Sequence, residues 1–396
     1  MRLTFHTAGE THGPALVAIV EGLPAGLAVR AEDVDRELGR RQTGHGRGGR
    51  MEIEKDRVEI LSGVRFGKTL GGPVALMLRN LDWENWREKM AQDGEGAGVE
   101  PLDTVRPGHA DLAGALKYGH GDVRSVLERA SARETAARVM AGALAKRLLA
   151  ELGVAVVCHV ISIGRFRVPA EAEGNAQKAA GAQSSPLRMA DPGTEAAAVR
   201  WIDELKEAGT TAGGVVEVIA TGVPPGLGSC VAWDKRLDGR LGQALMSIPA
   251  IKGVEVGGGC GLASLPGREA LDEVFPGPSG RNLLLGKRAL PFHRETNRAG
   301  GLEGGMTNGE PLVARASMKP IPTQSSPLRT VTLGSWRSAA AHTERGDVCA
   351  VPAAAVVAEA MVGIVLADAF LEKFGGDALP DILYNYTNYL ERICGR

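Results

Sequence analysis

The chain has 396 residues, 44% of them hydrophobic and 23% charged, so it can bury a sizeable core and is not disordered as its main state. Its 46 basic and 47 acidic residues give a formal net charge of -1, so no overall field would attract nucleic acid or an anionic membrane. The five cysteines are widely spaced, which argues against a disulfide framework or a zinc site and favours a reducing compartment.

Three segments show the alternation or β-branched runs that are typical of strands: Met51 to Leu61, Val154 to Gly164 and Gly214 to Val223. Between them, residues 82–104 carry two tryptophans and a polar, glycine-bearing run, which predicts an exposed flap. Residues 169–192 are predicted to form a loop as well.

Two segments predict helices. The first runs from about Ala132 to Glu151, with Ser131 and Glu134 as a capping box and Gly153 past its end. The second runs from about Ala353 to Phe374, with Pro352 near its start and Gly375 just past its end. The most hydrophobic stretch, Val348 to Phe370, is interrupted by a proline and two acidic residues, which favours a buried helix over a membrane span.

Strands and helices that do not alternate regularly favour an α+β fold, with layers over a doubly wound sheet. Because neither a long linker nor a composition break divides the chain, we expect one domain over residues 1–396. We expect a single-domain β-α-β layered sandwich with antiparallel sheets around helices and a loop-rich active site.

Three glycine-containing motifs fit known nucleotide or nucleic-acid signatures poorly. Gly44, Gly46 and Gly49 form a G-x-G-x-x-G, but a strand-like segment follows where a dinucleotide fold needs a helix. Gly63 stands one residue too close to the GKT at 67–69 for a phosphate loop. The arginine-glycine run at 40–50 lacks the aromatic residues of a nucleic-acid segment, so small anionic ligands explain it better.

Two of the eight histidines lie in polar turns, His12 in GETHGP and His109 in RPGHAD. Glycine and proline expose the backbone there, and Glu10, Arg106 and Asp111 are charged neighbours. A histidine titrates near neutrality, so each is a candidate general acid or phosphate contact, with a purely structural histidine as the alternative.

Arginines gather at several points along the chain, and Asp347 stands just ahead of the second predicted helix. Arg129 and Arg133 flank Ser131, the predicted helix start, where unpaired N–H groups and the helix dipole favour an anion. Asp347 is either a helix cap or a buried proton-handling carboxylate. Since arginine binds phosphate and carboxylate in a bidentate manner, the set implies a ligand with several negative groups. Its remaining members are Arg40, Arg41, Arg47, Arg106 and Arg345.

Eight segments, in this order, resemble the chorismate synthase family and span nearly the whole chain. They are GETHGP (9–14), RRQTGHGRGGRM (40–51), RPGHADLAGALKYG (106–119), RASARETAAR (129–138), IPAIKGVEVG (248–257), NRAGGLEGGMTNGEP (297–311), KPIPT (319–323) and RGDVCAVPAA (345–354).

The resemblance implies a lyase that eliminates phosphate from 5-enolpyruvylshikimate 3-phosphate in an anti-1,4 sense to give chorismate. It also implies reduced FMN as a cofactor without net redox change, because an electron-rich flavin can lend density to a difficult elimination. NADPH is a possible reductant, and the source of reduced FMN stays open. A cytoplasmic homotetramer that binds neither nucleic acid nor membranes is expected.

Site roles follow from the same resemblance. His12 would donate a proton near the leaving phosphate, His109 would protonate the reduced flavin, and Asp347 would help to relay that proton. Arg40, Arg47, Arg106, Arg133 and Arg345 match substrate contacts. The matching FMN contacts are Arg129, Ala130, Ser131, Pro249, Ala250, Gly304, Lys319, Pro320, Ile321, Pro322, Thr323 and Arg345, and the matching nicotinamide nucleotide positions are Arg41 and Arg47.

Two positions depart from the family pattern, and two other functions stay open. Thr11 replaces the usual serine and preserves the hydroxyl, whereas Pro249 replaces a frequent polar amide and removes a donor. A flavin-dependent oxidoreductase acting on an anionic substrate is the main alternative. An RNA-binding or ribonucleotide-binding protein, built on the arginine-glycine run, is the non-enzymatic one.

Overall fold

The computed structural model describes residues 2–49, 54–96, 98–278, 280–343 and 346–395. Two antiparallel sheets form its frame. The four-stranded sheet has the order β1 (Thr4–Ala8), β2 (Ala15–Glu21), β6 (Val74–Arg79) and β3 (Val58–Ser62). The five-stranded sheet has the order β10 (Ile251–Val256), β15 (Leu312–Met318), β9 (Gly214–Thr221), β7 (Ala155–Ile163) and β8 (Phe166–Arg167).

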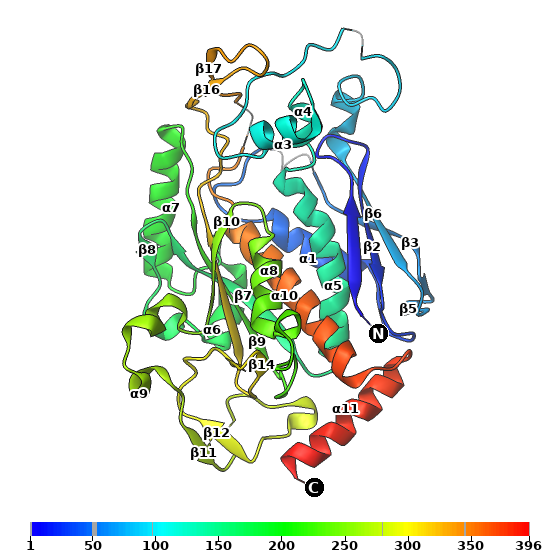
Figure 1. Cartoon of the computed structure of the whole chain (residues 1–396), viewed down its shortest axis with the longest axis vertical. Helices are drawn as coiled ribbons and strands as arrows, with labels where there is room; N and C mark the ends of the chain where they lie inside the picture. Colours follow the sequence, from blue (N-terminus) through cyan, green and yellow to red (C-terminus); the bar gives the residue numbers. More distant parts are fainter. Residues whose placement is uncertain (1, 50–53, 97, 279, 344–345, 396) are drawn as a thin grey trace.

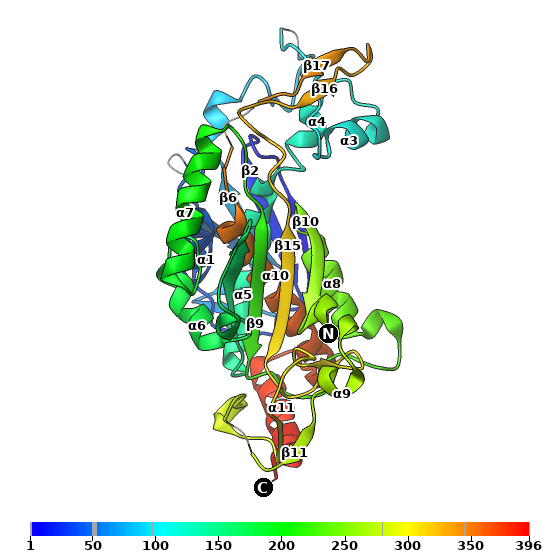
Figure 2. The same cartoon turned by 90° about the vertical axis from the view of Figure 1, so that its left-hand side faces the viewer.

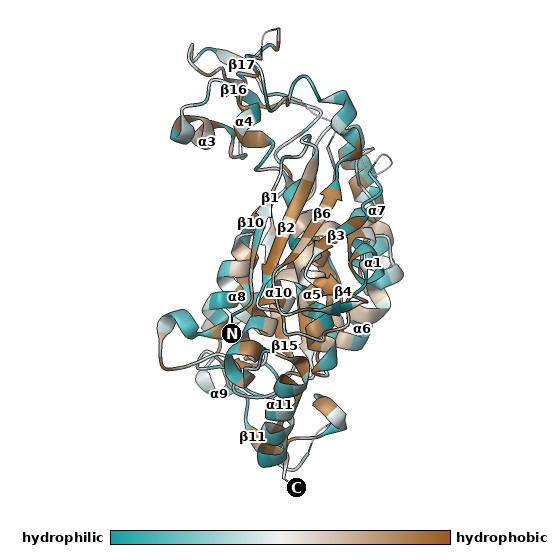
Figure 3. Cartoon of the chain, turned by 90° about the vertical axis from the view of Figure 1, so that its right-hand side faces the viewer, coloured by the Kyte–Doolittle hydropathy of each residue, from teal (hydrophilic) through white to brown (hydrophobic). Residues whose placement is uncertain are grey.

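Three helices pack against one another: α1 (Ala31–Gln42), α5 (Thr135–Glu151) and α10 (Val351–Phe374). The helix α5 contacts both sheets, whereas α1 packs against the four-stranded sheet and α10 against the five-stranded sheet. In Figure 1 they lie between the four-stranded sheet and the strands β7 and β9. Figure 3 shows apolar residues concentrated on β2 and β6. The α+β prediction is confirmed. The doubly wound sheet is wrong, because every strand pair in both larger sheets is antiparallel.

The central helix α10 is apolar all round, the pattern of a helix buried on every side. It is long and apolar enough to cross a membrane, yet its most apolar window is wholly buried inside the protein, as the sequence predicted. Gly142 of α5 makes the close packing possible, because a Cβ there would come within 2.4 Å of the Ala360 Cβ. Small residues at this crossing therefore allow the two helices to touch along their backbones.

The remaining helices cover the outside or the ends of this frame. The helices α6 (Ala176–Gly181) and α7 (Pro192–Glu207) flank the five-stranded sheet, and α8 (Leu237–Met246) packs against α10 and β10 (Figure 2). One end of the molecule carries α3 (Asp111–Tyr118), α4 (Arg124–Leu127), β16 (Arg329–Val331) and β17 (Ser338–Ala340). The other end carries α9 (Gly267–Ala270), β11 (Val274–Pro276), β12 (Phe292–Arg294) and α11 (Leu379–Cys394). There are also two short hairpins, β4 (Val64–Arg65) with β5 (Lys68–Thr69), and β13 (Leu302–Glu303) with β14 (Met306–Thr307).

The predicted elements match closely, with three corrections. The strand expected from Met51 begins at Val58 within the described part of the chain. Residues 169–192 are helical turns rather than a loop, because the Asn175 side chain caps α6 by accepting from two backbone N–H groups. Ser131 caps the turn η2 (Ala132–Glu134) ahead of α5, but Glu134 closes no capping box, because its carboxylate instead binds Thr7 and Arg138.

Candidate active site

The GETHGP turn joins β1 to β2, and Gly9 makes it tight. The φ of Gly9 is +106°, and a Cβ there would lie 2.2 Å from the carbonyl oxygen of Ala15. The backbone oxygen of Glu128 accepts from the Thr11 N–H at 3.0 Å and from its hydroxyl at 2.9 Å. The carboxylate of Glu128 accepts from the His12 N–H at 2.7 Å and lies 2.8 Å from His12 Nδ1. The segment after α4 therefore fixes the turn.

The segment that follows β6 covers the His12 ring. Trp86 stacks on it, with ring centroids 3.8 Å apart and planes 13° from parallel. Asp82, in the turn η1 (Leu81–Asn85), places an oxygen 3.8 Å from His12 Nε2. The start of the predicted flap is thus packed against a candidate catalytic side chain rather than extending away from it.

Arg133 supports the same turn indirectly, through Asn80. Its guanidinium lies 2.7 and 2.9 Å from the Asp56 oxygens and donates to Asn80 Oδ1 at 3.0 Å. Asn80 in turn donates to the carbonyl oxygen of Gly13 at 2.7 Å. Arg41 is buried beside this group and binds Thr135 and the Ala132 carbonyl. Burial and the Arg133 charge lower the pKa of Arg41 to about 9, so it stays charged at neutral pH.

His109 belongs to a second cluster, at the start of α3. Asp111, which is fully buried, hydrogen-bonds His109 Nδ1 and accepts from Arg106 Nε at 2.9 Å. Burial alone would raise the pKa of Asp111, but the hydrogen bonds from His109 and Arg106 outweigh it and hold that pKa well below its usual range. Arg106 also donates to Thr323 Oγ1 at 3.1 Å.

The KPIPT segment lies against this second cluster. Lys319 Nζ donates to the Gly108 carbonyl at 2.9 Å, and its backbone N–H donates to the Ala250 carbonyl at 3.0 Å. Ala250 holds a left-handed backbone, with φ +68°. Burial and the charge of Lys252 lower the pKa of Lys319. A bound anion would offset the repulsion between these two ammonium groups, so the site fits a phosphate-bearing cofactor.

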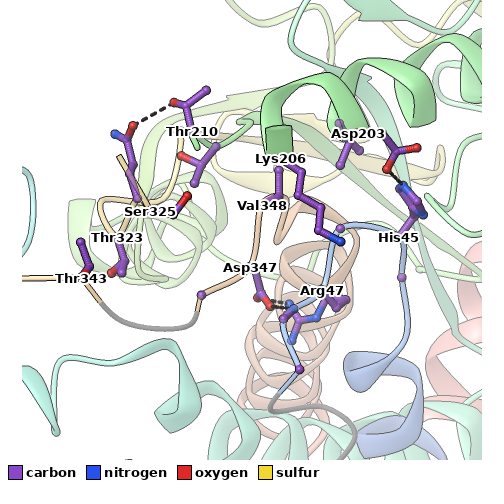
Figure 4. A pocket seen from close by; sticks show the side chains of 18 residues that line it. His45, Arg47, Asp203, Lys206, Thr210, Thr323, Ser325, Thr343, Asp347 and Val348 are labelled. Atoms are coloured by element: carbon purple, nitrogen blue, oxygen red, sulfur yellow. Dashed lines mark hydrogen bonds and ion pairs between the residues drawn. The ribbon is translucent and has the colours of Figure 1, made fainter. Parts of the chain in front are cut away.

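A cavity of about 770 Å³ opens beside these residues and has Thr323, Arg47 and Asp347 in its lining (Figure 4). Arg47 lies 2.7 Å from an Asp347 oxygen, and the Gly48 N–H donates to the other oxygen at 2.7 Å. Lys206, from α7, directs its ammonium into the cavity between Asp347 and His45 (Figure 4). The sequence did not single out Lys206, because a lysine on a polar helix face looks like an ordinary surface residue.

Three predicted contacts lie elsewhere. Arg40 forms ion pairs with Glu37 and Glu359 between α1 and α10 and donates a hydrogen bond to Gln183. Arg129, whose side chain is 41% exposed, donates to the carbonyl and hydroxyl of Thr7 on β1. Gly304 lines a separate cavity of about 550 Å³ beside β13.

Of the other predicted contacts, Ala130 and Ser131 form the connection from α4 to η2, and Pro249 precedes Ala250. Pro320, Ile321 and Pro322 lead from Lys319 to Thr323, where the Ile321 carbonyl accepts from the Thr211 hydroxyl at 2.8 Å. Arg345 lies outside the described residues. Among those residues, no group of three or more His, Cys, Asp or Glu side chains is placed to hold a metal ion.

The α+β frame, a cavity lined by Arg47, Lys206 and Asp347, and two carboxylate-bound histidines outside that lining fit an enzyme that acts on a small molecule. The family model of chorismate synthase matches residues 3–371. The chain is 54% identical over 389 residues to the chorismate synthase of Trichlorobacter lovleyi, covering 98% of both chains. It is 55% identical over 394 residues to that of Moorella thermoacetica, covering 99% of this chain and 100% of the relative.

A solved structure titled as the crystal structure of chorismate synthase is also similar. It superposes with a TM-score of 0.79 at 42% identity, covering 100% of this chain and 99% of the other. The chain belongs to the chorismate synthase family. Its reaction is the elimination of phosphate from 5-enolpyruvylshikimate 3-phosphate to form chorismate, in the biosynthesis of aromatic amino acids.

Proposed function

We propose that the elimination takes place in the cavity beside Arg47 and Thr323 and requires reduced FMN. The observation that carries this proposal is the meeting of three sequence segments: RPGHAD, KPIPT and the turn at Ala250 are joined by direct hydrogen bonds. Their charged and hydroxyl groups suit a phosphate and a polar chain. Reduced FMN, when bound, supplies electron density to a substrate whose lost hydrogen is not acidic.

The roles of the chain's own residues follow from their partners. Arg47 and Lys206 line the cavity and would bind the substrate's anionic groups, with Asp347 holding Arg47 in place. His12 donates a proton to the departing phosphate, and His109, backed by Asp111, handles the proton on the flavin side. Asp347, a carboxylate in the cavity lining, would relay that proton. Arg106 positions His109 and Thr323.

Four predicted contacts are assigned differently. Arg40, Arg41 and Arg133 are held by partners inside the protein, so we assign them the task of supporting the site rather than touching the ligand. The burial of Arg41 gives no support to a nicotinamide contact there. Gly304 would reach the cofactor only from a different part of the assembly. Arg129 to Ser131, Pro249, Ala250, Lys319 to Thr323 and Arg345 remain predicted FMN contacts.

An anaerobic assay tests the chemistry. The enzyme, dithionite-reduced FMN and 5-enolpyruvylshikimate 3-phosphate are mixed, and chorismate, phosphate and flavin absorbance are followed together. Chorismate and phosphate should appear in equal amounts and in many turnovers, while the reduced flavin is not consumed. Oxidation of one flavin per product would instead support the oxidoreductase alternative, and turnover without flavin would overturn the cofactor assignment.

The assembly and location are also proposals. We infer a single catalytic domain over residues 1–396, acting as a cytoplasmic homotetramer. One continuous hydrophobic core joins strands of both sheets to the central helices, which supports the single domain. Light scattering during size-exclusion chromatography tests the tetramer, and cell fractionation tests the location.

A further inference from the structure

Glu128 makes four hydrogen bonds to the turn that carries His12. Its two carboxylate oxygens take the His12 backbone N–H and ring Nδ1, at 2.7 and 2.8 Å. Its backbone oxygen takes the N–H and the hydroxyl of Thr11, at 3.0 and 2.9 Å. Glu128 itself is only 2% exposed. A buried carboxylate 116 residues away in sequence therefore fixes both the backbone and the ring of His12.

This contact decides which ring nitrogen takes part in proton transfer. An ionised carboxylate can only accept hydrogen bonds, so the nitrogen that faces it carries a proton. With Nδ1 engaged in this way, a proton that His12 gives or takes moves through Nε2, on the opposite side of the ring.

One face of the ring is covered as well. Trp86 stacks on the imidazole with nearly parallel planes, and Lys89 lies over the same indole, 5.2 Å from its centroid. A stack on the ring face leaves the edge nitrogens accessible to partners, so Trp86 restricts rotation of the ring without covering Nε2. The hydrogen bond from Glu128 and the stack from Trp86 act on different degrees of freedom of one side chain.

We propose that Glu128 is a positioning residue for the elimination: it holds His12 in the tautomer and orientation that present Nε2 to the departing phosphate. This inference rests on the proposed role of His12. Glu128 immediately precedes Arg129, so the segment that orients His12 also begins the predicted cofactor triplet. Glu128 does not line the cavity, so a change at Glu128 acts on catalysis only through His12.

A double-mutant cycle tests the proposal. Glu128→Ala, His12→Ala and the double variant are assayed for chorismate formation with saturating reduced FMN and substrate. Glu128→Ala should lower kcat by a factor on the order of 10², with KM nearly unchanged, since general acid catalysis contributes roughly 10²–10⁴-fold. In the His12→Ala background the same change should cost less than about 3-fold, because residues that act as a unit are not additive.

Glu128→Gln provides the second variant if the alanine variant does not fold. A single amide oxygen replaces two carboxylate oxygens, so the His12 N–H and Nδ1 cannot both keep an acceptor, and kcat should still fall about 10-fold or more. Glu84→Gln is the matched control, because Glu84 is exposed on the same covering segment and pairs with Arg87. It should keep wild-type kcat. Thermal unfolding and FMN titration confirm that each variant is folded.

The possible failures are distinguishable. Wild-type kcat in Glu128→Ala or Glu128→Gln would overturn the positioning role. A large His12→Ala loss that multiplies fully with the Glu128→Ala loss would also overturn it, leaving His12 as the proton donor. Wild-type kcat in His12→Ala would overturn the proposed role of His12 and the positioning role together. The elimination by the wild-type enzyme is measured in the same assay. Its failure would overturn the proposed function itself and is distinguishable from all three results.

Discussion

His12 and His109 lie in similar glycine-flanked turns, and a buried carboxylate engages Nδ1 of each, but the two carboxylates are used differently. Asp111 is two residues from His109 and is shared with Arg106, so one acid holds a histidine and an arginine together. Glu128 is distant in sequence and gives both of its oxygens to His12. The His109 cluster couples proton handling to an arginine that reaches Thr323. The His12 cluster is dedicated to orienting a single ring.

The largest expected effect comes from removing either ring. His12→Ala and His109→Ala should each lower kcat by roughly 10²–10⁴-fold. His109→Ala should also alter the absorbance spectrum of the bound reduced flavin, whereas His12→Ala should leave that spectrum nearly intact and slow phosphate release in a single turnover. Anaerobic stopped-flow measurements separate the two. Identical spectra with equal rate losses would break the distinction between the clusters.

Exchanging the arginine of each cluster sharpens the comparison further. Arg106→Lys should lower kcat/KM by a factor on the order of 10², because lysine cannot hold Asp111 and Thr323 together. Arg133→Lys, on the His12 side, should mainly lower the unfolding temperature, because Arg133 binds Asp56 and Asn80 inside the protein. Steady-state kinetics and thermal unfolding of both variants show whether each arginine acts on catalysis or on stability. A larger kinetic loss in Arg133→Lys would show that Arg133 contacts the ligand after all.

A smaller effect is expected from the stack on His12. Trp86→Leu keeps an apolar contact but removes the aromatic plane, and aromatic pairs contribute about 1 kcal/mol beyond burial. The kcat should therefore fall about 5-fold, with little change in the unfolding temperature. Trp83→Leu is the control from the same segment. Equal losses in both variants would indicate a general effect of the segment rather than of the stack.

The smallest effect concerns acid stability. A carboxyl whose pKa is depressed in the folded state stabilises the protein above its unfolded-state pKa, and this contribution is lost as the pH falls toward the folded-state pKa. The pKa of Asp111 is held below the reference value of 3.8. The free energy of unfolding should thus fall as the pH drops below about 4, and less steeply in Asp111→Asn. Urea unfolding at several pH values measures both slopes, and equal slopes would contradict the assignment.

The sequence by itself determined the elements with strong local signals. The proline and glycine at its two ends predicted a helix from about Ala353 to Phe374, where the structure has α10 over Val351–Phe374, and the β-branched runs located β7 and β9. The cluster at His109 was also accessible, because Arg106, His109 and Asp111 lie within six residues of one another in one turn. The eight ordered segments were sufficient to identify the family.

Only the tertiary structure decided which charged residues face the cavity. Arg40 and Arg47 stand in one basic run, yet packing of α1 against α10 directs Arg40 to Glu359, while the turn beyond α1 brings Arg47 to Asp347. Lys206 and Glu128 carry no local mark of their roles, because their partners are supplied by other parts of the chain. Local propensity determines helices and turns, but the direction of a side chain depends on the elements that pack around it and on the charges that they bury with it.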